Sequence, residues 1–168
     1  MKKAKKLSVI VIVFVAIIAL IAIAFSSRNR SYSDVVKTFV NASLDSNAKK
    51  VASLFPDPAI IYTTGSVYDK DELTEYIEQK FPALFESLES RYMDLSNISY
   101  EITAVGDMSE STLAQLKDLH SSVGTEIEEA KILDVELSDG SDSPYHNKTI
   151  MISVVKIGRL WYLAEFIW

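Results

Sequence analysis

The chain has 168 residues with 17 basic and 23 acidic side chains, and it contains no cysteine. Without cysteine, disulfides, thiolate metal sites and cysteine nucleophiles are excluded. Once Lys2, Lys3, Lys5 and Lys6 are set aside, 13 basic side chains remain against 23 acidic ones, a net charge of −10. So acidic a domain is a poor partner for nucleic acid or anionic lipid headgroups, because both bind basic faces.

Residues 7–25 form one apolar run in which Ser8 is the only polar side chain. At about 1.5 Å per residue, a helix of this length spans roughly 28 Å, close to the hydrocarbon thickness of a bilayer. The sequence therefore predicts a transmembrane helix over residues 7–25. The predicted anchor residues are Leu7, Phe14, Leu20 and Phe25.

The charges around this run predict its orientation. Four lysines precede it, whereas only Arg28 and Arg30 follow it closely, and basic residues are retained on the cytoplasmic side. We expect a cytoplasmic basic segment over residues 1–6, a tether over 26–32 and an extracytoplasmic domain over 33–168. The chain would then lie in the cell membrane as a single-pass protein.

A cleaved secretory signal is the alternative to an anchor. Residues 22–24 read Ala-Ile-Ala, the pattern of small residues that signal peptidase cuts, here after Ala24. A secretory apolar core usually has about 7 to 15 residues, and the longer run here favours an uncleaved anchor. Cleavage would instead release a secreted ligand-binding domain.

Apolar side chains at three- and four-residue spacing predict helices in the first part of the domain. The first should start near Ser33 or Asp34, and the second should be capped by Asn47. A short strand over residues 60–62 is expected to follow them.

A third helix is expected to open at Asp69, where Glu72 completes a capping box. Its apolar stripe continues to Glu89. Pro82 lies inside the stripe and should bend the helix or split it in two, because proline lacks an N–H and clashes with the preceding turn.

Alternating apolar and polar residues predict strands over 97–105, 130–137, 149–157 and 160–168. Ser109 is expected to cap a further helix between the first two of these strands. With the helices early and antiparallel strands late, the order favours an α+β fold in which helices cover one face of a curved antiparallel sheet.

Two stretches carry a resemblance to the nuclear transport factor 2-like superfamily, a cone-shaped α+β fold also called cystatin-like. One runs from Val36 to Phe55 and includes DSNAKKVASLF, and the other is the ending VVKIGRLWYL from Val154 to Leu163. Many small extracytoplasmic members end with a strand, a glycine-containing turn and a Trp-Tyr strand. The resemblance covers residues 33–168, although the helix around Ser111 is an addition to the simplest members. It implies no single activity, since the superfamily includes isomerases, dehydratases, transport adaptors and anchored proteins.

The resemblance implies a cavity between the sheet and the broken helix. The side chains expected to line it are Phe39, Tyr62, Ile77, Phe81, Tyr100 and Trp161. In the enzymes of this fold an Asp or His base and a Tyr or acid donor project into the cone. The strand acids that could supply the base are Glu101, Asp134, Glu136 and Glu165. Each of these acids lies between apolar neighbours on its strand, and because side chains alternate between the two faces of a strand, each acid should face solvent. We therefore expect no catalytic residues.

His120 and His146 are the only two histidines. We expect them to be exposed or capping, because neither has a second ligand at metal-binding spacing and a metal needs three or four convergent ligands. The loop containing Asp139 and Asp142 lacks the calcium-loop pattern and is expected to be a solvated turn. The sequence therefore predicts no metal and no cofactor.

The leading hypothesis is a membrane-anchored extracytoplasmic domain used for binding or assembly. Its partners would be the membrane and either a small apolar ligand or an envelope protein, by analogy with type IV secretion scaffolds that join one transmembrane helix to this fold. The competing hypothesis is a cavity enzyme of the isomerase or dehydratase type. That enzyme would need a carboxylate deep in the cone beside a tyrosine, with a pKa raised by burial. The oligomeric state is left open.

Overall fold

The computed structural model describes residues 30–91 and 93–167. Residues 31–168 form one compact unit of the chain. The predicted anchor, with Leu7, Phe14, Leu20 and Phe25, lies outside the described residues. Within the described part, no helix is long and apolar enough to cross a bilayer.

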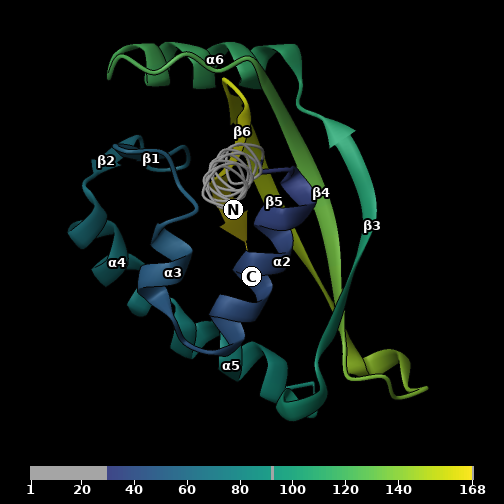
Figure 1. Ribbon diagram of the computed structural model, residues 1–168. Helices are drawn as coiled ribbons and strands as arrows, with labels where there is room; N and C mark the ends of the chain where they lie inside the picture. Colours follow the sequence, from purple (N-terminus) through teal and green to yellow (C-terminus); the bar gives the residue numbers. More distant parts are fainter. Residues whose placement is uncertain (1–29, 92, 168) are drawn as a thin grey trace, which may run out of the picture. The chain divides into compact units, whose positions relative to one another are not determined.

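Five α-helices and six strands make up the described unit (Figure 1). The helices are α2 (Tyr32–Leu44), α3 (Ala48–Ala52), α4 (Lys70–Glu78), α5 (Phe81–Glu89) and α6 (Glu110–Ser121). The strands are β1 (Ala59–Ile61), β2 (Ser66–Tyr68), β3 (Ser99–Asp107), β4 (Glu129–Ser138), β5 (Asn147–Ile157) and β6 (Leu160–Ile167). Two 3-10 turns, η1 (Leu95–Asn97) and η2 (Pro144–His146), precede β3 and β5.

The last four strands form one antiparallel sheet in the order β3-β4-β5-β6, and β1 pairs with β2 in a small separate sheet. β3 bends along the outer edge of the large sheet (Figure 1). A bulge between Ile102 and Ala104 interrupts its pairing with β4. The α+β class and the curved antiparallel sheet agree with the prediction, whereas β2 was not predicted.

Local signals explain where most of the helices begin. Asp69 caps α4 and forms a capping box with Glu72, and Pro82 stands in the first turn of α5, so it splits the predicted third helix in two. Asn47 caps α3 as predicted. The cap of α2 is Ser31 rather than Ser33 or Asp34, because Asp34 acts as the returning carboxylate of a capping box.

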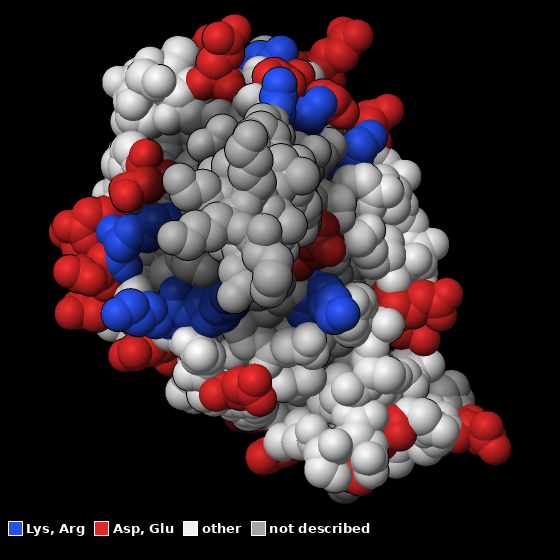
Figure 2. Space-filling view, in the orientation of Figure 1, with Lys and Arg blue, Asp and Glu red and all other residues white. Residues whose placement is uncertain are grey.

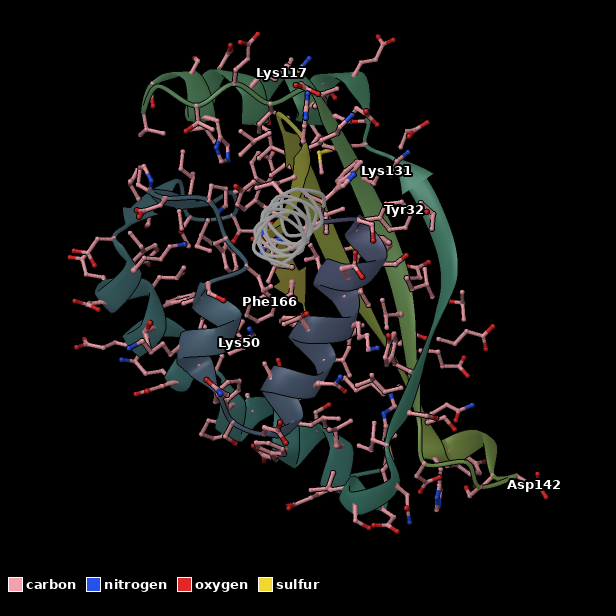
Figure 3. The ribbon with its side chains drawn as sticks, viewed as in Figure 1. Tyr32, Lys50, Lys117, Lys131, Asp142 and Phe166 are labelled. Carbon is pink, nitrogen blue, oxygen red and sulfur yellow. The ribbon has the colours of Figure 1, made fainter. Side chains whose placement is uncertain are left out.

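Strand register separates the two faces of the large sheet. Leu133 of β4 lies opposite Ile152 of β5, which lies opposite Phe166 of β6. Side chains on this face pack against α2, α3, α4 and α5 to form the main core. Phe39 of α2 reaches Phe166 with ring centroids 4.9 Å apart. Figure 3 labels Phe166 at this helix-covered side.

A second, smaller core lies on the opposite face. Ala130 of β4 lies opposite Val155 of β5, and both pack with Leu116 of α6. Helices therefore cover parts of both faces. The prediction that they cover one face is corrected at α6, whose apolar stripe needs its own patch of sheet to be buried.

Candidate binding site beside helix α6

Helix α6 borders a hollow of about 430 Å3 that we call the α6 hollow. Its lining consists of Tyr62, Gln115, Asp118, Leu119 and Ser122. The four α6-side residues stand at positions i, i+3, i+4 and i+7, which places them on one side of the helix. Tyr62 comes from the turn after β1 and packs against the second core. The hollow thus lies between elements far apart in the sequence.

A hydrogen bond fixes the mouth of this hollow. The Tyr62 hydroxyl donates to Gln115 Oε1. Leu116, the next residue along the helix, is fully buried in the second core and fixes the rotation of α6. The α6 hollow therefore has an apolar part supplied by Leu119 and a polar rim supplied by amide, carboxylate and hydroxyl groups. Such a mixture suits a small, mostly apolar ligand or an apolar side chain of a partner.

A second hollow, of about 420 Å3, follows the end of α6. It is lined by Lys117, Asp118, Ser121, Gly124, Thr125, Glu126 and Ile127. Gly124 has a φ of +76°, a conformation that glycine adopts at low cost where a helix ends. Asp118 borders both hollows. Figure 3 shows Lys117 on α6 at this end of the molecule.

His120 is enclosed beneath the last turn of α6. Its side chain is fully buried, and neither ring nitrogen has a hydrogen-bond partner among the described residues. Burial lowers the pKa of His120 below its ordinary value, because the charged imidazolium is poorly solvated there. The prediction that this histidine is exposed or capping is wrong. His120 lies on the buried, apolar face of α6, one turn after Leu116.

The six residues predicted to line one cavity separate into two groups. Five belong to the main core or pack against it: Phe39, Ile77, Phe81, Tyr100 and Trp161. Tyr62 packs instead with the second core and lines the α6 hollow. The resemblance implies one cavity lined by all six side chains, but it carries no information on which face of the sheet the turn residue Tyr62 approaches. The α6 side of the hollow was not predicted, and the i, i+3, i+4, i+7 spacing of its residues is the signal that could have identified it.

The strand acids considered for the enzyme hypothesis lie on the face opposite the main core. Glu101 pairs in register with Glu136, and Asp134 pairs with Ala104 and Met151. Glu165 instead accepts hydrogen bonds from the Thr63 amide (3.2 Å) and hydroxyl (2.5 Å). Figure 2 shows acidic side chains in separate groups over the visible face rather than in one patch.

Asp139 and His146 form a carboxylate–histidine pair that the sequence did not reveal. His146 Nδ1 lies 2.9 Å from Asp139 Oδ2, and the Asp139 side chain is only 4% exposed. The same carboxylate accepts hydrogen bonds from the backbone amides of Asp94 and Ser141, both at 3.0 Å. These amides, with His146, hold the pKa of Asp139 well below its ordinary value. These contacts form a clamp that holds Asp139 at the base of the loop, while residues 140–142 beyond it are exposed, in agreement with the predicted solvated turn.

The clamp joins the β4–β5 loop to the segment that leads into η1. Its tip, which carries Asp142, points away from the sheet (Figure 3). Within residues 30–91 and 93–167, no group of three or more His, Asp or Glu side chains is arranged to hold a metal ion. The Asp139–His146 pair is best described as a structural contact that orders this loop.

No protein-family model matches the chain, and no curated protein matches it. One similar solved structure is described as a calcium/calmodulin dependent protein kinase II association domain from Xanthomonas campestris. It is 11% identical, with a TM-score of 0.33, over 80% of this chain and 81% of that one.

Proposed function

We propose that this chain is a single-pass membrane protein that displays a nuclear transport factor 2-like domain outside the cytoplasm for binding or assembly. The observation that carries the proposal is the contrast between the apolar run over residues 7–25 and the compact unit over residues 31–168, which has its own core. An apolar run of this length preceded by lysines is typical of a signal anchor. The helix-rich first half and the final Trp-Tyr hairpin support the fold family.

Binding accounts for the described residues better than catalysis does. A general base for isomerase or dehydratase chemistry needs a desolvated carboxylate inside the enclosed side of the cone. Glu101, Asp134 and Glu136 instead lie on the face opposite the main core. The α6 hollow has the dimensions and mixed lining of a site for a small apolar ligand or for a side chain of an envelope protein.

The anchor is tested by the mass of the protein after extraction from its native membrane. We expect a mass that includes residues 1–25, and we expect a variant lacking these residues to appear in the soluble fraction as a folded protein. The deletion is the control, because it retains the whole compact unit. A mature mass that begins at Phe25 would contradict the anchor and leave a secreted domain.

The binding role is tested by placing a photo-cross-linking residue at Asp118, which is exposed and borders both hollows. We expect a discrete adduct in intact membranes. The matched control is the same probe at Glu78, an exposed helical position on α4. Equal adducts from both positions, or none from Asp118 together with no small molecule retained in the native mass of the protein, would contradict a partner or ligand at the α6 hollow.

A further inference from the structure

A buried lysine lies at the opposite end of β5 from α6. Lys148 is 9% exposed and stands in register with Leu137, on the sheet face that packs against the helices. Val155, which contacts the second core, is seven residues further along the strand, roughly 23 Å away at the rise of a β-strand. This end of the sheet is therefore separate from the α6 hollow.

Ser87 of α5 contacts Lys148, and Arg91, which follows α5, contacts the residue before Lys148. The Lys148 ammonium donates a hydrogen bond to the Ser87 hydroxyl. Arg91, four residues after Ser87, donates from Nη1 to the backbone oxygen of Asn147 at 3.0 Å. A guanidinium, an ammonium and a hydroxyl thus converge between α5 and the start of β5. Each has N–H or O–H groups beyond those used in these bonds.

Neither cation forms an ion pair with a carboxylate among the described residues. The basic side chains that do so are Lys131, His146 and Lys156. Burial first, and the charge of Arg91 second, lower the pKa of Lys148, and no carboxylate raises it. The C-terminal end of the α5 dipole supplies about half a negative charge at most, which cannot balance two cations. Lys148 is buried, and a charge removed from water is normally paired, yet no acid among the described residues forms an ion pair with it.

We propose that Lys148, Arg91 and Ser87 form a binding site for an oxyanion, the carboxylate or phosphate group of a ligand. The guanidinium offers a planar pair of donors, the ammonium a point charge, and the hydroxyl a third donor, which is a common combination around carboxylate and phosphate oxygens. An anion at this position neutralises the two adjacent charges. The site does not depend on the anchor or on the α6 hollow.

The test uses the full chain in nanodiscs, with inorganic phosphate and acetate titrated separately by calorimetry against a constant chloride background. We expect saturable one-to-one binding of at least one anion. Lys148→Met, which keeps an unbranched apolar stem, should weaken it at least tenfold, and Arg91→Gln should do the same. Lys50→Met is the matched control, because Lys50 is an exposed cation on another helix, and it should leave the affinity within twofold of the wild type.

A second measurement separates a bound anion from general screening. The 13Cε resonance of Lys148 reports its titration, and a bound anion should raise the pKa of Lys148 by stabilising the ammonium. Binding of phosphate alone identifies a phosphate site, and binding of acetate alone a carboxylate site. The proposal is overturned if neither anion binds, if Lys148→Met and Arg91→Gln both bind as tightly as the wild type, or if saturating anion leaves the Lys148 titration unchanged. Because Arg91 is exposed, its variant remains informative even if Lys148→Met fails to fold.

Discussion

Replacing Phe39 with alanine should lower the free energy of unfolding of the domain by about 3–5 kcal/mol. Phe39 is fully buried, and its ring lies 4.9 Å from that of Phe166. Phe55, after α3, also contacts Phe166, at 6.3 Å between ring centroids. The three rings join α2, the segment after α3, and β6. Truncation would leave a cavity that these rigid neighbours cannot close. The variant would therefore lose the transfer free energy of the buried ring and would also carry the free-energy cost of the cavity.

Urea unfolding of the fragment comprising residues 26–168, followed by near-ultraviolet circular dichroism, measures this loss. A decrease of this size is a large part of the roughly 5–15 kcal/mol that stabilises an ordinary domain. The control is Tyr145→Ala, which removes an aromatic side chain that is 76% exposed and should change the free energy by less than about 0.5 kcal/mol. If the two variants lose the same small amount, the packing of α2 on the sheet is not as described.

Phe39 also shows which features of the fold could be predicted from the sequence. Its position in α2 follows from the spacing of Val36, Phe39 and Val40, which are all buried. Asp69 and Pro82 likewise determine helix boundaries through their own backbone chemistry. Each of these signals acts within a few residues of its source, and the helix face or helix boundary that it predicts is confirmed.

The features that were missed depend on residues far apart in the chain. Tyr62 and Gln115 are 53 positions apart, and Asp94 and Asp139 are 45 apart. Neither pairing has a local pattern, because only the assembled sheet brings the partners together. The bulge between Ile102 and Ala104 likewise has no local sequence pattern, because it is defined by the pairing of two strands. Thus the spacing along α6 could have identified one side of the α6 hollow, but the contribution of Tyr62 and the contacts of the clamped loop could not be derived from periodicity.

His120 gives the second large prediction, which concerns the dependence of stability on pH. Burial lowers the pKa of His120 in the folded protein, whereas the unfolded chain titrates near the ordinary value of 6.5. Below pH 6.5 the unfolded state therefore binds more protons than the folded state, and stability must fall as the pH decreases toward the folded value. Above pH 6.5 the imidazole is neutral in both states and contributes no pH dependence.

His120→Leu should remove this loss and also stabilise the domain at pH 7.5 by about 1 kcal/mol. The imidazole nitrogens have no partner among the described residues, and an unsatisfied buried polar group costs about 1–3 kcal/mol. A leucine of comparable volume avoids that cost, less a small repacking penalty. Urea unfolding at several values between pH 7.5 and 5.0 should show the difference between wild type and variant growing as the pH falls.

Because the chain has only two histidines, His146→Asn is a matched control for the remaining imidazole. It removes the contact with Asp139 but leaves the buried ring under α6, so the slope due to His120 should persist. If His120→Leu keeps the full slope of the wild type while His146→Asn abolishes it, the acid sensitivity belongs to the clamped loop. If His120→Leu instead destabilises the domain at pH 7.5, the ring has a hydrogen-bond partner that stabilises the folded state, and α6 is held to the sheet by a polar contact as well as by Leu116.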